Sequence, residues 1–137
     1  MFGVEGLGGA QVVLVVEDDH LVRLITSEYL RDFGLNVFEA PTAEDAMDVL
    51  ASADVALVLT DVHMPGTNGL EFARIVRARQ PETPIIVVSG RFETGEVVEE
   101  LGQHTMFVEK PYNIEQLGQA IVRLVSARCP RQASGAA

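Results

Sequence analysis

Residues 56–66 have the sequence Ala-Leu-Val-Leu-Thr-Asp-Val-His-Met-Pro-Gly, in which an apolar run meets a carboxylate and then a turn. Short apolar runs rich in β-branched residues are typical of strands buried on both faces of a parallel sheet. The Pro-Gly pair ends such a strand just beyond Asp61. Asp61 is therefore predicted at the C-terminal end of a buried strand, which is the edge of an open parallel sheet where ligands bind.

Four further apolar runs predict four more strands, at residues 11–16, 35–39, 85–88 and 105–109. Predicted helices separate the strands, at residues 20–33, from 42 onward, from 68 onward, at 91–103 and from 114 onward. Helix 20–33 has Val22, Ile25, Tyr29 and Phe33 at the spacing of an apolar helix face, while the poorly patterned helix at 91–103 is expected to be short or mobile. The alternation predicts an α/β fold with a five-stranded parallel sheet, doubly wound, in the flavodoxin-like strand order 2-1-3-4-5.

The chain length of 137 residues predicts a single domain with a substantial core. Residues 1–10 are rich in glycine and are expected to form a flexible N-terminal segment. The domain itself is expected to occupy residues 11–127, and residues 128–137 to form a flexible tail of small residues. The single cysteine, Cys129, excludes an internal disulfide.

The net charge of −10 argues against a nucleic-acid-binding or anionic-membrane-binding surface, since both need a basic patch. The same charge is compatible with a metal cation as ligand. The first ten residues lack the features of a secretion signal. No apolar run approaches the roughly 20 residues needed to span a bilayer. The sequence therefore predicts a cytoplasmic protein.

Polar residues follow four of the predicted strands at their C-terminal ends, where a parallel sheet brings them together. They are Glu17 and Asp18 after the first strand, Asp61 after the third, Ser89 after the fourth and Lys110 after the fifth. Three neighbouring carboxylates need a counter-charge, and Mg²⁺ suits them because it takes carboxylates and usually pairs with a phosphate. Lys110 adds a second positive group. This set favours attack by the Asp61 carboxylate on a phosphoryl group.

The same residues, with Met-Pro-Gly at 64–66 and a proline after Lys110, resemble the signature of the response-regulator receiver domain of two-component signalling. The resemblance is of the chemotaxis-regulator type and covers residues 11–127. It implies that a histidine kinase or a histidine phosphotransfer protein donates a phosphoryl group to Asp61. It also implies a signalling domain rather than an enzyme, with chemistry limited to its own phosphorylation and dephosphorylation.

Mg²⁺ is the cofactor that the resemblance implies. Asp18 and Asp61 resemble direct ligands, Glu17 resembles a ligand acting through water, and the backbone carbonyl of His63 resembles the third protein ligand. The side chain of His63 is expected to face solvent, as is more common for a loop histidine than metal ligation.

Other positions resemble the parts of the family that bind and report the phosphoryl group. Lys110 resembles the phosphate-binding lysine, and its bond to Pro111 is expected to be cis. Ser89 resembles the switch hydroxyl. Phe107 stands where the family has a rotating aromatic, although simple packing on an edge strand accounts for it equally well.

His63 and Arg91 occupy the two variable positions that tune the lifetime of the phosphoryl group in this family. Phosphorylation is expected to shift the face formed by residues 91–103, the strand at 105–109 and the helix from 114. Few residues follow that helix, so output is expected through contacts with a downstream protein or through phosphoryl relay. The sequence leaves open whether the chain is part of a larger regulator.

Two other functions fit the same fold. The first is a phosphorylation-independent adaptor, which is disfavoured because the residues needed for phosphorylation are present. The second is a phosphatase with Asp61 as nucleophile. Such an enzyme would use a second carboxylate two residues further on, where this chain has His63.

Overall fold

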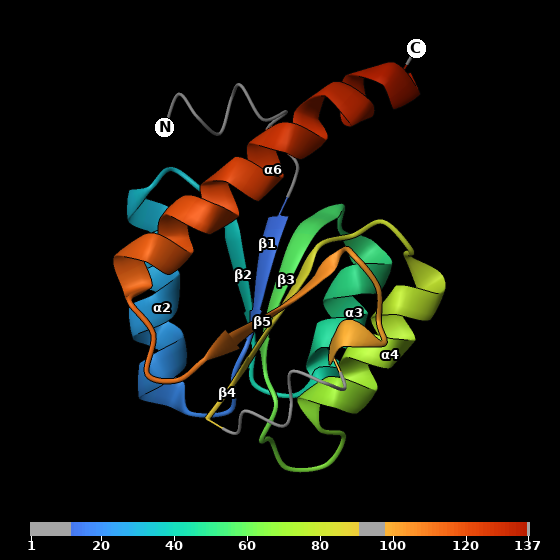
Figure 1. Cartoon of the computed structure of the whole chain (residues 1–137). Helices are drawn as coiled ribbons and strands as arrows, with labels where there is room; N and C mark the ends of the chain where they lie inside the picture. Colours follow the sequence, from blue (N-terminus) through green and yellow to red (C-terminus); the bar gives the residue numbers. More distant parts are fainter. Residues whose placement is uncertain (1–11, 91–97, 137) are drawn as a thin grey trace.

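The computed structural model describes residues 12–90 and 98–136, with side chains up to residue 126. Five parallel strands form one sheet in the order β2-β1-β3-β4-β5 (Figure 1). Their bounds are Val12–Val16 (β1), Val37–Ala40 (β2), Val55–Asp61 (β3), Ile85–Ser89 (β4) and Thr105–Glu109 (β5). The helices are His20–Asp32 (α2), Ala43–Ser52 (α3), Gly69–Arg79 (α4) and Ile114–Ala136 (α6). The predicted fold class and strand order are confirmed.

The two central strands are buried along their whole length because they are continuous apolar runs. Val16 of β1 pairs with Thr60 of β3, so the next residues, Glu17 and Asp61, leave neighbouring strands at the same level. β5 is only half-buried and forms an edge of the sheet, as its less apolar sequence predicts. The sheet thus presents its polar residues at one edge, beyond a dry centre.

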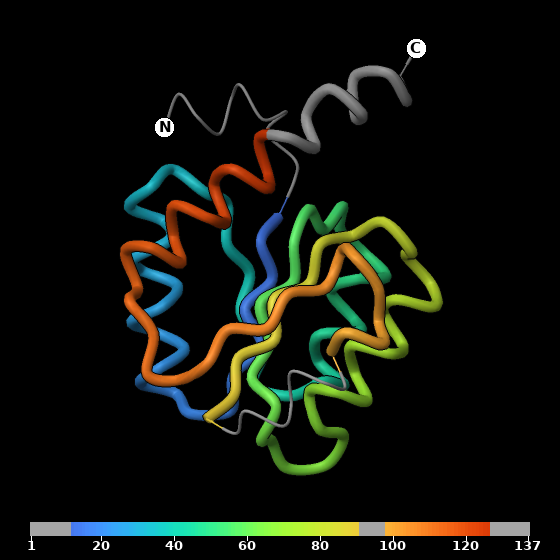
Figure 2. Tube along the Cα trace, viewed as in Figure 1, coloured from blue at the N-terminus to red at the C-terminus, as the bar shows by residue number. Residues whose placement is uncertain are grey.

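Helices cover both faces of the sheet, with α2 and α6 on one side and α3 and α4 on the other (Figures 1 and 2). Side chains alternate along each strand, so β1 contributes to two separate cores. Leu14 and Val16 pack with Phe72 of α4, whereas Val13 and Val15 pack with Ile121 of α6. Packing on both faces of the sheet holds the strand ends in position.

The apolar face expected for the first helix is wrong. The buried residues of α2 are Thr26, Ser27 and Leu30, while Val22 and Ile25 are 38% and 58% exposed. The small side chains of Thr26 and Ser27 let the helix lie close to the sheet beside Leu30, and Val22 and Ile25 consequently face outward. Periodicity identified the helix correctly but not its orientation about its own axis.

Three expected segments differ from the structure or fall outside it. Most of the helix predicted at 91–103 lies outside the described residues, as does the predicted N-terminal segment at 1–10. The bounds of α6 extend past residue 127, where a tail is expected. The predicted flexibility of residues 128–137 stays a prediction. Within the described part of the chain, no helix is both long and apolar enough to cross a membrane.

Candidate phosphoacceptor site

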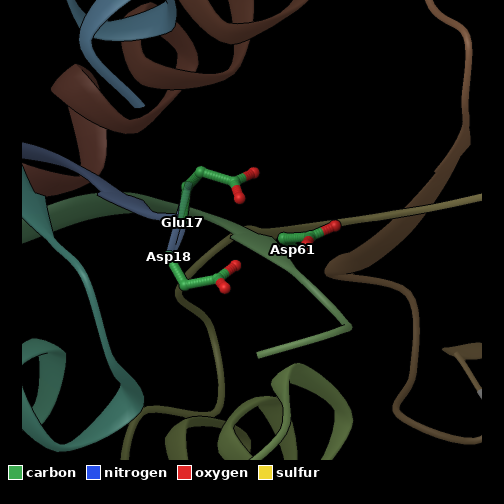
Figure 3. A group of neighbouring side chains, drawn as sticks. All are labelled: Glu17, Asp18 and Asp61. Carbon is green, nitrogen blue, oxygen red and sulfur yellow. The ribbon is translucent and has the colours of Figure 1, made fainter. Parts of the chain in front are cut away.

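Three carboxylates lie together beyond the ends of β1 and β3. Glu17 and Asp61 are 8% and 7% exposed, and Asp18 is exposed. Each offers one oxygen, and these oxygens lie within 4.8 Å of one another. Figure 3 shows the three side chains gathered near the ends of two neighbouring strands, with Glu17 and Asp18 on opposite sides of the ribbon. These carboxylates lie close together, as predicted, because the register of β1 and β3 places the ends of the two strands side by side.

Acidic residues of the loop between β1 and α2 accept the hydrogen bonds that hold this loop in shape. Asp19 caps α2 by accepting hydrogen bonds from the backbone N–H groups of Leu21 and Val22, at 3.0 and 3.1 Å. The N–H of Asp19 in turn donates to the Glu17 carboxylate at 3.0 Å. The cap therefore turns the chain sharply after β1 and leaves the carboxylate of Asp18 at the rim.

Lys110 reaches the same place from the end of β5. Its Nζ lies 3.0 Å from Oδ1 of Asp61, and its bond to Pro111 is cis, as expected. No described residue gives Oδ1 an aligned hydrogen bond, although the atom is buried. Lys110 and Asp61 therefore form an ion pair, in which a partly exposed ammonium group meets a buried carboxylate.

The pKa values of two groups reflect this crowding. Burial raises the pKa of Glu17 from 4.5 to about 7, with a further rise from the charge of Asp61 and a partial offset from the Asp19 N–H. Burial lowers the pKa of Lys110, but its contact with Asp61 and the charge of Glu17 outweigh burial and raise it. Lys110 thus stays protonated, while the acids carry more negative charge than one lysine offsets.

The family model for the response regulator receiver domain matches residues 13–122. The chain belongs to this family. A receiver protein from Pseudomonas putida is 32% identical, with a TM-score of 0.75 over 82% of this chain and 96% of that one. The chemotaxis response regulator CheY4 of Vibrio cholerae is 28% identical, with a TM-score of 0.74 over 83% of this chain and 98% of that one.

A curated relative, a cyclic di-GMP phosphodiesterase of Thermotoga maritima, is 37% identical over 119 residues. That match covers 85% of this chain but only 31% of the relative. The chain spans about a third or less of the length of such curated relatives. What is shared is the receiver domain, a signalling domain of two-component systems.

The other predicted site residues of this receiver domain lie in different surroundings. Ser89 ends β4 and is fully buried, and its backbone carbonyl accepts a 2.9 Å hydrogen bond from the N–H of Lys110. His63 is exposed in the loop after β3. Phe107 is half-buried and packs against the core that faces α3 and α4. Arg91 lies outside the described residues.

Gly69, the first residue of α4, was not predicted to matter for the site. A Cβ at this position would collide with the backbone carbonyl oxygen of Asp61. Glycine therefore lets α4 begin directly against the end of β3, and the N–H of Gly69 donates to the carbonyl of Val62 at 2.9 Å. A glycine just after the capping Asn68 was the only available signal in the sequence.

A small cavity of about 20 Å³ lies beneath the ion pair. Its polar lining comes from Glu17, Thr26, Asp61, Lys110 and Tyr112. That volume suffices for one water molecule with several polar partners. Thr26 and Tyr112 were not singled out from the sequence, because neither a position in a helix, as for Thr26, nor a position in a loop, as for Tyr112, reveals which side chain faces a strand end.

Proposed function

We propose that this receiver domain accepts a phosphoryl group on Asp61 from a phosphohistidine of a histidine kinase or a phosphotransfer protein. One observation carries the proposal. The buried Asp61 carboxylate has the Lys110 ammonium 3.0 Å away and the carboxylates of Glu17 and Asp18 close by. A nucleophilic carboxylate is thereby surrounded by groups suited to bring a cation and an anion against it.

The donor set fits Mg²⁺. The available atoms are all oxygens, which a hard cation prefers, and Oδ1 of Asp61 is buried without an aligned donor. Asp18 and Asp61 would hold the ion directly, Glu17 through water, and His63 through its backbone carbonyl. When bound, Mg²⁺ supplies positive charge that offsets the three carboxylates and the oxygens of an incoming phosphoryl group.

Asp61 performs the transfer itself. One of its carboxylate oxygens forms a bond to phosphorus while the bond from phosphorus to the donor nitrogen breaks, and the donor imidazole keeps that electron pair. Lys110 stays protonated and offsets the charge on the phosphoryl oxygens. Burial of Asp61 excludes most competing water from its carboxylate.

The response is proposed to begin at Ser89 and Phe107. Phosphorylation replaces the single negative charge of the Asp61 carboxylate with a phosphoryl group that carries about −1.5 to −2 units, and the Ser89 hydroxyl is expected to turn toward it. Ser89 is bonded through its carbonyl to Lys110, so a shift there bears on the end of β5. The affected face would comprise residues 91–103, β5 and α6. His63 and Arg91 are proposed to tune the lifetime of the phosphoryl group.

Receiver domains act between histidine kinases and downstream effectors, and we infer a downstream protein as the target here. The net charge of −10 supports a partner that is neither a nucleic acid nor an anionic membrane. A cytoplasmic location, which the sequence predicts, stays a proposal.

Intact-mass measurement tests the proposal. The protein is incubated with MgCl₂ and a small phosphodonor such as acetyl phosphate or phosphoramidate. Wild type should gain one phosphoryl group, and Asp61→Asn should gain none. Asp48→Asn is the matched control, because it removes an exposed carboxylate on α3 and should leave the gain intact.

Three outcomes would contradict the proposal in different ways. A wild type that gains no phosphoryl group from any donor would favour the phosphorylation-independent adaptor. Sustained turnover of a phosphate ester would favour the phosphatase. Phosphorylation that persists in Asp61→Asn would move the acceptor to another residue.

A further inference from the structure

Arg23, in the second turn of α2, connects the acidic loop to the neighbouring edge strand. Its Nη1 donates to the backbone carbonyl of Glu17 at 2.7 Å, and its Nε lies 3.3 Å from the carboxylate of Glu39 on β2. Its Nη2 lies 3.0 Å from Nδ1 of His20. The side chain of Arg23 is only 12% exposed. A guanidinium held at all three nitrogens fixes whatever it binds.

What Arg23 binds is the peptide unit between two of the site's carboxylates. The carbonyl of Glu17 and the N–H of Asp18 belong to the same planar group, so holding one orients the other. Glu17 is also held at its N–H, which donates to the carbonyl of Ala40 at 3.0 Å, and at its carboxylate, which accepts from Asp19. Among the described residues, Arg23 is the only one of these partners that donates to Glu17 from a side chain.

The positive charge of Arg23 is largely offset by the carboxylate of Glu39. The second oxygen of Glu39 lies 3.2 Å from Nη1 of Arg31, so two arginines of α2 share one carboxylate. Arg31 makes its other strong contact with the carbonyl of Val37, at 3.0 Å, and does not touch Glu17. Both arginines thus bind Glu39, but Arg31 is 39% exposed against 12% for Arg23, and only Arg23 reaches the site.

We propose that Arg23 is a positioning residue for the metal site, which orients the Glu17–Asp18 peptide so that both carboxylates are in place before Mg²⁺ binds. The inference rests on the proposed function, because it assumes that the site takes Mg²⁺. Groups that orient metal ligands typically contribute 10- to 100-fold to metal affinity. Arginine suits the role because its planar fork presents several N–H donors in fixed directions, and so holds a carbonyl and a carboxylate in one geometry.

Titration of the full chain with MgCl₂, followed by amide NMR, tests the inference. This measurement reports both the fold and the dissociation constant for Mg²⁺ without relying on phosphorylation. Arg23→Gln should weaken Mg²⁺ binding by about 10- to 100-fold. Arg31→Gln is the matched control, and it should bind Mg²⁺ like wild type because it keeps the Glu17 contact. Arg23→Lys should lie between wild type and Arg23→Gln.

The possible failures are distinguishable. Wild-type Mg²⁺ affinity in a folded Arg23→Gln would overturn the role of Arg23 and leave the proposed function intact. An equal loss in Arg31→Gln would also overturn it, because the loss would then come from general loosening of α2 and β2. A wild type that binds no Mg²⁺ would overturn the proposed metal site and this inference with it. If Arg23→Gln does not fold, Arg23→Lys decides, with unchanged affinity again counting against the role.

Discussion

At the scale of single residues, the site holds more negative charge than its one lysine balances. Glu17, Asp18 and Asp61 face Lys110, and the buried pair of acids cannot both ionise without cost. Burial is the main cause of the raised pKa of Glu17, and the charge of Asp61 adds to it. Protonation of Glu17 removes one of the negative charges that a bound cation would otherwise offset.

This raised pKa predicts a pH-dependent stability in EDTA. Because the pKa rises from 4.5 to about 7 on folding, the folded state binds a proton that the unfolded state releases between those values. The contribution of Glu17 to the free energy of unfolding is therefore full below the unfolded pKa, falls as pH rises through the interval, and stays low above it. Relative to Glu17→Gln, wild type should lose stability from about pH 5 to about pH 7.

Urea unfolding followed by circular dichroism, at a series of pH values, measures this difference. Glu28→Gln is a suitable control, because Glu28 is 66% exposed on α2 and far from the acids of the site. Its difference from wild type should vary little with pH. A difference between wild type and Glu17→Gln that is flat across the interval would show that Glu17 ionises normally in the folded protein.

At the scale of elements, α2 joins the site to the rest of the fold. It begins at the Asp19 cap beside the carboxylates, and its buried face is made of Thr26, Ser27 and Leu30. Just after its end, Phe33 packs across Gly118 of α6, where a Cβ would collide with the ring. Phe33 also meets Tyr29 edge-on, with ring centroids 5.3 Å apart. The notch at Gly118 therefore fixes how α2 and α6 lie together.

This packing predicts that Gly118→Ala changes stability in opposite directions in two backgrounds. In wild type, the added methyl group should displace the Phe33 ring and destabilise the protein by about 1 kcal/mol. With Phe33→Ala, the collision is absent, so alanine should stabilise the helix interior by about 0.5–1 kcal/mol relative to glycine. Urea unfolding of the four proteins gives the coupling free energy between the two positions. The same sign in both backgrounds would rule out the notch.

At the scale of the whole molecule, the sequence predicted the fold and the strand ends for a common reason. Apolar runs identify buried parallel strands, and a parallel sheet places the residue after each run at one edge, which brought Asp61 and Lys110 together. The side of α2 that faces the sheet was not predictable from periodicity, because small polar residues are buried there. Arg23 and Gly69 were missed because both act on backbone carbonyl oxygens, whose positions exist only in the assembled fold.

The proposed Mg²⁺ site would couple metal binding to the stability of the entire chain. Mg²⁺ that binds only the folded state should raise the free energy of unfolding by about 1.4 kcal/mol at ten times its dissociation constant. Asp18→Asn should abolish this increase without lowering stability in EDTA, because it removes a ligand and also relieves repulsion. Asp48→Asn changes the net charge of −10 by the same amount at an exposed position, and it should keep the full response. If both variants lost the Mg²⁺ response equally, the stabilisation would come from general screening of the acidic chain, and the three carboxylates would have no special part in it.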